Sequence, residues 1–290
     1  MKVTIAMPVY NGERFIREAL DSLLAQTFTD FELIVSDNAS TDSTAEICRE
    51  YQERDARIKY IRQPENRGAF LNAEMAVRAG SGEYTMMVGD DDVYDRRYIE
   101  MLVPMLERDP DVGLAYSNYG FIDERGVKTP STLHTFFQRA QSAASVFAGY
   151  DRHRICLPMI MGLMRSDLFK NALPFQAFDK TTGDLDNLLI LRFLSFGKRV
   201  DSTREVLFHY RMKDRGGAAR PPDWPKTLWG QRVKLFFHHF EFMRRTFAIV
   251  DRSAFRPLQR LLLKWRAIET LVAYSTVLPL PIALRERRAR

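Results

Sequence analysis

The chain has 290 residues, 46% hydrophobic and 28% charged, which is typical of a soluble globular protein with one large domain or two small ones. Two cysteines, Cys48 and Cys156, exclude a disulfide framework and a cysteine-based metal site, and the lack of any apolar run of 18 residues disfavours a membrane-spanning helix. The net charge of +6 is uneven, because the segment from Lys226 to Arg290 has 14 Lys and Arg against 4 Asp and Glu. This basic tail predicts an anionic partner, and we favour a membrane surface over nucleic acid.

Strands and helices alternate over the first 116 residues. This alternation predicts parallel strands joined by right-handed crossovers, with the polar loops after the first, second and fourth strands meeting at one edge. The first loop lacks a Gly-x-Gly-x-x-Gly pattern, which disfavours a nicotinamide-dinucleotide site. The predicted strands are Val3–Met7, Phe31–Val35, Ile58–Ile61, a stretch ending at Val88, and Val112–Tyr116, and the helices between them end near Gln26, Arg54, Ala79 and Arg108.

The pattern is looser beyond residue 116. A hairpin turn is predicted at Asp123–Gly126, and the Met-rich segment Met159–Met164 is predicted to lie in the core. The remaining predictions are helices over Arg139–Tyr150, up to Phe196, over Lys226–Val250 and over Ser253–Thr276, and a strand over Glu205–Tyr210.

The run Gly89-Asp90-Asp91-Asp92 places three carboxylates just past a buried strand. Ligands bind at this edge of an open α/β sheet, and oxygen ligands suit Mg²⁺ or Mn²⁺ that also takes phosphate oxygens. The alternative is an acidic turn that caps a helix beginning near Arg96.

Four motifs in order and spacing resemble the inverting family 2 glycosyltransferases of the GT-A fold. The resemblance covers roughly the first 215 residues and implies a Rossmann-like, mostly parallel central sheet flanked by helices, here with a helical C-terminal extension. The motifs are Pro8-Val9-Tyr10-Asn11-Gly12, Ser36-Asp37-Asn38-Ala39-Ser40-Thr41-Asp42, Asn66-Arg67-Gly68 with Asn72, and Gly89-Asp90-Asp91-Asp92.

The resemblance implies a nucleotide-sugar donor, usually a UDP-sugar, and a divalent metal, Mn²⁺ or Mg²⁺. Asp91 would hold the metal, and Asp92 would support it or cap a helix. The motif departs from the family at Gly89, where Asp is common, and at Asn38, where a second acidic residue is common. The implied nucleotide-sugar residues are Pro8, Val9, Tyr10, Asn11, Asp37, Asn38, Asn66, Arg67, Gly68, Asn72 and Asp90.

The segment Gly183-Asp184-Leu185-Asp186 resembles the acidic site that supplies the family's general base. By this match Asp184 deprotonates the acceptor hydroxyl, with Asp186 in reserve, and a single displacement inverts the anomeric centre. The alternative is that Asp184 caps the following helix. Arg211 and Lys213 fall in a late family segment that closes over the diphosphate, with Lys213 at the family's His position, although such a run is also typical of a solvated loop. Arg165 borders the family's acceptor region.

Taken together, these features predict a metal-dependent inverting glycosyltransferase that acts on a glycan or lipid-linked glycan in cell-surface polysaccharide biosynthesis. We expect residues 1–115 to bind the donor, 116–215 to bind the acceptor, and 216–290 to form a basic helical extension. The N-terminus shows no signal peptide, so we expect a cytoplasmic protein. The tail is either a peripheral anchor on the inner face of the membrane or a helical pair packed on the domain or on a second subunit in a homodimer. The rival functions are a nucleotidyltransferase and an inactive sugar-nucleotide-binding scaffold.

Overall fold

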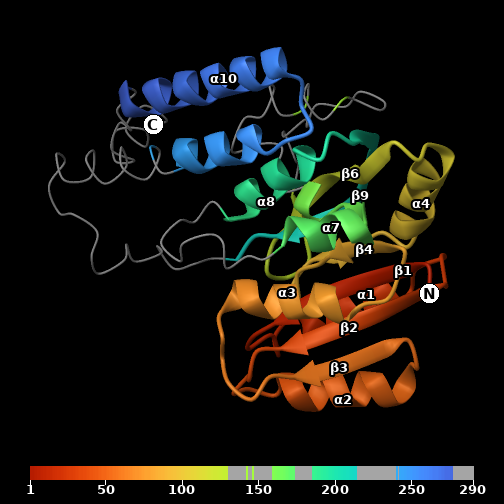
Figure 1. The fold of residues 1–290 in the computed structure, drawn as a ribbon. Coiled ribbons are helices and arrows are strands. Elements are labelled where there is room, and N and C mark those ends of the chain that lie inside the picture. The colour runs from red at the N-terminus through yellow and green to blue at the C-terminus, as the bar shows by residue number, and fades with distance from the viewer. Residues whose placement is uncertain are drawn as a thin grey trace, which may run out of the picture. The chain divides into compact units, whose positions relative to one another are not determined.

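The computed structural model describes residues 1–129, 142, 146, 159–173, 185–213, 240 and 242–276. The chain forms two compact units, Met1–Arg215 and Gly216–Arg290. The first unit contains a nine-stranded mixed sheet with the order β3-β2-β1-β4-β8-β6-β9-β5, and β7 pairs with β6 (Figure 1).

The N-terminal half of the sheet is parallel, as the alternating pattern predicts. Strand β1 pairs with β2 on one side and β4 on the other, and β2 pairs with β3. The elements, in chain order, are β1 (Val3–Val9), α1 (Ile16–Leu24), β2 (Phe31–Asp37), α2 (Thr44–Arg54), β3 (Ile58–Arg62), α3 (Ala69–Ala79) and β4 (Tyr84–Met87).

The second half of the sheet differs from the prediction. The short strand β8 inserts antiparallel between β4 and β6, whereas the sequence suggests only an apolar segment there. The strands β6 and β9 are longer than predicted and pair in parallel. The elements are β5 (Val93–Tyr94), α4 (Tyr98–Arg108), β6 (Val112–Ile122), β7 (Lys128–Thr129), β8 (Leu163–Arg165), α7 (Ser166–Ala172), α8 (Leu185–Leu194) and β9 (Arg199–Arg211).

The hairpin prediction at Asp123–Gly126 is confirmed. The backbone N–H of Gly126 donates to the carbonyl of Asp123, and Gly126 has a φ of 79°, in the left-handed region that glycine adopts without strain. The turn joins β6 to β7 in an antiparallel pair.

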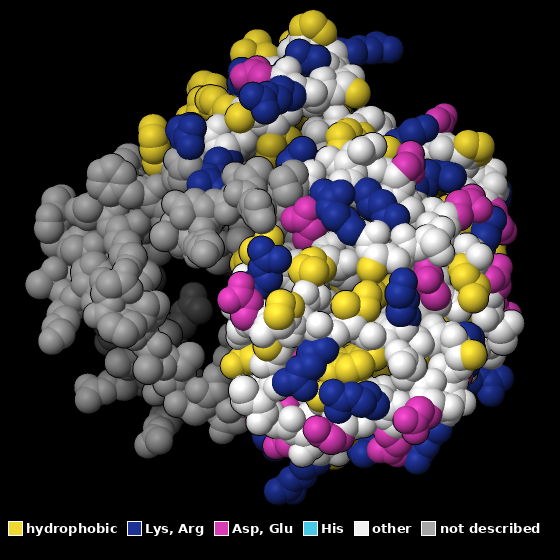
Figure 2. Space-filling model, turned by 60° about the horizontal axis from the view of Figure 1, so that its bottom comes forward, with side chains coloured by type: hydrophobic (Ala, Val, Ile, Leu, Met, Phe, Trp, Pro, Cys, Tyr) yellow, Lys and Arg dark blue, Asp and Glu magenta, His cyan; other side chains and the backbone are white. Residues whose placement is uncertain are grey.

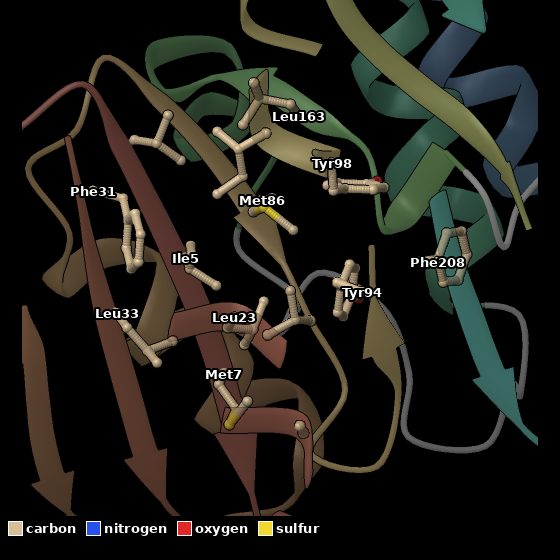
Figure 3. Packing of buried hydrophobic residues seen from close by; sticks show 14 of the residues in the cluster. Ile5, Met7, Leu23, Phe31, Leu33, Met86, Tyr94, Tyr98, Leu163 and Phe208 are labelled. Atoms are coloured by element: carbon tan, nitrogen blue, oxygen red, sulfur yellow. The ribbon is translucent and has the colours of Figure 1, made fainter. Parts of the chain in front are cut away.

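The core lies between the sheet and helices α1, α2 and α4. Alternate residues of β1, namely Val3, Ile5, Met7 and Val9, face it because successive side chains of a strand point to opposite faces. Figure 3 shows Ile5 and Met7 packed among Leu23, Phe31 and Met86. The Met-rich segment is also buried, as predicted, with Met159, Leu163 and Met164 at 0% exposure.

An aromatic cluster ties the chain just after the acidic run to β9. Tyr94 stacks on Phe208 with ring centroids 5.7 Å apart, and Tyr98 meets Tyr94 edge-on at 5.1 Å (Figure 3). Strand β5 pairs antiparallel with β9 through Val93 and His209. Such aromatic pairs add to the stabilisation from buried area, so they hold the acidic loop against β9.

The second unit contains a helical segment over 242–251 and helix α10 (Pro257–Thr276). None of the helices in the described ranges is long and apolar enough to cross a membrane. On the face of the molecule in Figure 2, Lys and Arg side chains are interspersed with acidic, apolar and uncharged ones rather than merging into one basic surface.

Candidate active site

Three loops meet at the carboxyl edge of the parallel strands. The register pairs Val9 with Asp37 and Ala6 with Met87, so β1, β2 and β4 end at the same edge. The loops at this edge contain three of the four motifs that the sequence singled out. This is the edge at which open α/β sheets bind ligands.

The first two loops are locked together by hydrogen bonds. The Asn11 backbone N–H donates to Ser40 Oγ at 2.9 Å, and the Thr41 backbone N–H donates to Asn11 Oδ1 at 2.8 Å. Asn11 and Ala39 both have positive φ angles, 53° and 59°. For an alanine this conformation costs about 1–2 kcal/mol, so the surrounding bonds hold the loops in a shape they would not adopt alone.

Asp37 shapes the second loop from within. Its carboxylate is fully buried, accepting from the Ser40 backbone N–H at 2.8 Å and from the Tyr60 hydroxyl at 2.6 Å. Burial, followed by the bond to Asp37, raises the pKa of Tyr60. The structure thus gives Asp37 a supporting position beneath the edge.

The side-chain amides of Asn38 and Asn72, which were predicted to bind the nucleotide-sugar, are already hydrogen-bonded within the protein. Asn38 donates from Nδ2 to Asn66 Oδ1 at 2.9 Å and accepts from the Arg67 backbone N–H at 2.9 Å. Asn72 accepts from Ser36 Oγ at 2.7 Å and donates to the carbonyls of Ser36, at 2.7 Å, and Val9, at 3.3 Å. Both asparagines are 2% exposed. They connect the ends of β1 and β2 to the loop before α3.

Several predicted residues remain accessible at the edge. The Tyr10 side chain is 47% exposed, Pro8 is half-buried, and Arg67 is exposed. Gly68 begins α3 with a φ of 88°, which favours glycine. Val9 is buried and belongs to the core rather than the surface of the site.

The three carboxylates of the acidic run differ in their surroundings. A Cβ on Gly12 would lie 2.4 Å from Asp90 Oδ2, so Asp90 touches the first loop. Asp92 is 1% exposed, with Oδ1 accepting from the Arg211 backbone N–H at 2.9 Å and Oδ2 buried without a hydrogen-bond partner. A Cβ on Gly89 would lie 2.9 Å from both Asp91 Oδ1 and Asp92 Oδ2, so these two oxygens converge.

Burial dominates the electrostatics of the acidic run. It raises the pKa of Asp90 to about 6 and that of Asp92 to about 7, and the negative charge of Asp91 adds to both shifts. The helix-cap alternative fails, because β5 intervenes and the Arg97 backbone N–H at the start of α4 is bound by Asp95 Oδ1. These three carboxylates therefore do not cap α4.

The end of β9 supplies cations to this loop from about 120 residues away in sequence. Arg211 is 2% exposed and donates from Nε to the Asp91 carbonyl at 2.7 Å, while its Nη2 pairs with Glu18. Lys213 Nζ lies 2.7 Å from Asp91 Oδ2 and over the Phe15 ring. No sequence pattern pointed to Glu18 or Phe15 as site residues, since both lie in an ordinary amphipathic helix pattern.

Arg165 lies away from the acidic run. Its partner across the sheet is Tyr84, at the opposite end of β4 from the acidic run. Its guanidinium donates to the carbonyls of Val112 at 2.9 Å and Leu106 at 2.7 Å. These hydrogen bonds join α4 to β6.

The described residues do not include the side chain of either candidate for the general base. Asp184 lies outside the described residues. Asp186 lies in the first turn of α8, where only the backbone is described.

Solved structures define the class of fold. The chain superimposes on TarS from S. aureus, described in complex with UDP-GlcNAc, with a TM-score of 0.67 at 18% identity over 91% of this chain and 70% of that one. A mannosyltransferase from Pyrobaculum calidifontis, described with GDP-Man and Mn²⁺, gives 0.57 at 18% identity over 99% and 79%. The fold is therefore GT-A, as the motifs predicted.

The sequence comparison then gives the family. A model described as Glycosyl transferase family 2 matches residues 4–170, and the chain belongs to that family. Glycosyltransferase GlyA of Streptococcus pneumoniae serotype 4 is 33% identical over 148 residues, which are 50% of this chain and 21% of GlyA. The chain spans between 21% and 43% of the length of GlyA and of two further relatives of this kind.

Proposed function

We propose that the chain transfers a sugar from a nucleotide-sugar, a UDP-sugar, to a hydroxyl of a glycan or lipid-linked glycan in cell-surface polysaccharide biosynthesis. The observation that carries this proposal is the preformed edge of the sheet. Exposed Tyr10 lies there on a loop that is hydrogen-bonded to the Ser40 loop, and Asp90 packs against Gly12 of the same first loop. The nucleotide-sugars named for the TarS and Pyrobaculum structures support a ligand of this class.

The donor would be bound by the accessible groups of the edge. The Tyr10 ring offers a surface against which a base can stack, and Asp90 can accept from a ribose hydroxyl. Arg67 places a positive charge on the neighbouring loop. Asp37, Asn38 and Asn72 contribute by holding these loops, because their polar atoms are already paired.

The acidic run suits a divalent cation, Mn²⁺ or Mg²⁺, at Asp91 and Asp92. The buried Asp92 Oδ2 has no partner, and it converges with Asp91 Oδ1 beside Gly89. Within the described part of the chain no three His, Cys, Asp or Glu side chains form a metal site by themselves. Mg²⁺ is commonly held by one or two carboxylates together with substrate phosphates, so the oxygens of Asp91 and Asp92 match its usual ligands. A bound cation would offset the charge on the departing diphosphate.

The transfer itself requires a base for the acceptor hydroxyl. We assign this role to Asp184, with Asp186 as the reserve, on the family resemblance. A carboxylate opposite the diphosphate takes the proton as the new bond forms, and one displacement inverts the anomeric centre. Residues 1–115 would bind the donor and residues 116–215 the acceptor.

Calorimetric titration with UDP-, GDP- and dTDP-sugars, first with Mn²⁺ and then with chelator, tests the proposal. We expect one UDP-sugar to bind, and to bind more tightly with Mn²⁺. If no nucleotide-sugar binds under either condition, the proposed donor site is wrong.

We also propose that the basic C-terminal unit places the enzyme on an anionic membrane surface. Leu258, Leu261 and Leu262 of α10 are 67%, 65% and 56% exposed and lie on one face with Trp265 at helical spacing. Arg260 and Lys264 hold the other side of the helix to the preceding segment, Lys264 pairing with Asp251 at 2.5 Å. An apolar stripe within a basic segment is typical of helices that lie in a lipid interface.

Flotation with vesicles distinguishes membrane binding by this apolar stripe from contact with a second subunit. The wild type should float with phosphatidylglycerol vesicles and not with phosphatidylcholine vesicles, and the triple variant Leu258→Gln, Leu261→Gln, Leu262→Gln should stay in solution. If the wild type binds neither kind of vesicle and elutes as a dimer, and the triple variant elutes as a monomer, the stripe instead contacts a second copy of the chain.

A further inference from the structure

A single ammonium group already stands at the acidic run. Lys213 Nζ lies 2.7 Å from Asp91 Oδ2, and the two side chains are 40% and 19% exposed. Within the described residues, this is the cation in contact with a carboxylate of Asp90, Asp91 or Asp92, since the Arg211 guanidinium reaches two carbonyls and Glu18. Because the Lys213 ammonium is exposed, water screens its attraction to Asp91 and can replace the carboxylate as its hydrogen-bond partner.

The backbone that presents Lys213 is firmly fixed. Two residues earlier, the Arg211 N–H is bonded to Asp92 Oδ1, and its buried side chain bonds to the carbonyls of Asp91 and Asp123. The pairing of β5 with β9 fixes the register of this strand against the acidic loop. The backbone two residues before Lys213 is therefore held close to Asp91.

The two oxygens of Asp91 face different groups. Oδ2 meets Lys213, and Oδ1 converges with the unpartnered Asp92 Oδ2 beside Gly89. An ammonium and a divalent cation on one carboxylate repel each other. The oxygens of a diphosphate, which are strong acceptors for both, would relieve that repulsion.

We infer that Lys213 competes with a divalent metal for Asp91 in the free protein and leaves that carboxylate when the diphosphate of the donor, a ligand that the family resemblance already implies for this segment, takes over its ammonium group. This rests on the proposed function, because it requires a nucleoside diphosphate at this edge. With Lys213 in this role, nucleotide and metal bind cooperatively, because each favours binding of the other. Part of the nucleotide affinity then does not depend on metal.

The test compares Lys213→Met with the wild type by calorimetry, using Mn²⁺ alone and UDP in chelator. Removing the ammonium should tighten Mn²⁺ binding about 5-fold or more, in the usual range for coupled sites. It should weaken UDP binding in chelator roughly 10-fold, as expected for a hydrogen bond to a charged group. Lys213→Arg should keep most of the UDP affinity. The matched control is Lys198→Met, which removes a half-buried lysine paired with Asp111 at 3.1 Å.

The outcomes are separable. If the wild type binds UDP but Lys213→Met leaves either the Mn²⁺ or the UDP affinity unchanged, Lys213 does not have this role. If the wild type binds none of UDP, GDP and dTDP with or without Mn²⁺, the proposed function itself fails. Thermal melting confirms that each variant is folded, since Lys213 lies at the surface.

Discussion

Replacing Asn72 with alanine tests whether this residue supports the site or binds the donor. Its side chain makes three hydrogen bonds, to Ser36 Oγ and to the carbonyls of Ser36 and Val9, while being 2% exposed. At about 1 kcal/mol for each bond, the variant should lose about 3 kcal/mol of unfolding free energy. For a unit of this size that corresponds to a melting temperature lower by roughly 6–12 °C.

Thermal and urea denaturation measure the loss, and calorimetry with UDP at low temperature measures the affinity of the protein that remains folded. We expect a large loss of stability with UDP affinity reduced only a few-fold. The matched control, Asn171→Ala on the exposed surface of α7, should change stability by less than about 0.5 kcal/mol. A variant that is nearly as stable as the wild type but binds UDP more than 10-fold more weakly would refute the reasoning and make Asn72 a donor contact.

Three further predictions concern the carboxylates. Asp91→Asn should abolish the Mn²⁺-dependent part of donor binding, measured by calorimetry with Asp111→Asn as control; unchanged metal dependence would remove Asp91 from the metal role. Asp184→Asn should keep donor binding and stop transfer in a radiolabelled-sugar assay, and retained transfer would move the base to Asp186. The raised pKa of Asp92, about 7, means that the folded protein binds its proton more tightly than the unfolded chain does. Stability from this group is therefore present at low pH and falls as pH rises from about 4 to 7, and stabilisation by Mn²⁺ should appear only as the carboxylate ionises, which melting curves at pH 5.5 and 8 can measure. Equal Mn²⁺ stabilisation at both values would contradict it.

The sequence by itself determined the parallel half of the sheet and the edge that carries the site. Both follow from local signals, namely the spacing of apolar residues and the polar motifs that interrupt them. The motif ending in Asp92 and the loop at Asn11 are contiguous stretches, and their position after buried strands fixes their edge whatever the rest of the chain does.

Only the tertiary structure decided how those residues are used. Strand β8 inserts antiparallel because the buried segment at Leu163 pairs with two strands that are distant in sequence. The amides of Asn38 and Asn72 face inward, and Arg165 lies at the far end of β4, because hydrogen-bond partners depend on which loops meet. Lys213 reaches Asp91 across 122 positions of sequence through the pairing of β5 and β9. Long-range pairing is set by the burial of the whole domain, which no local pattern specifies.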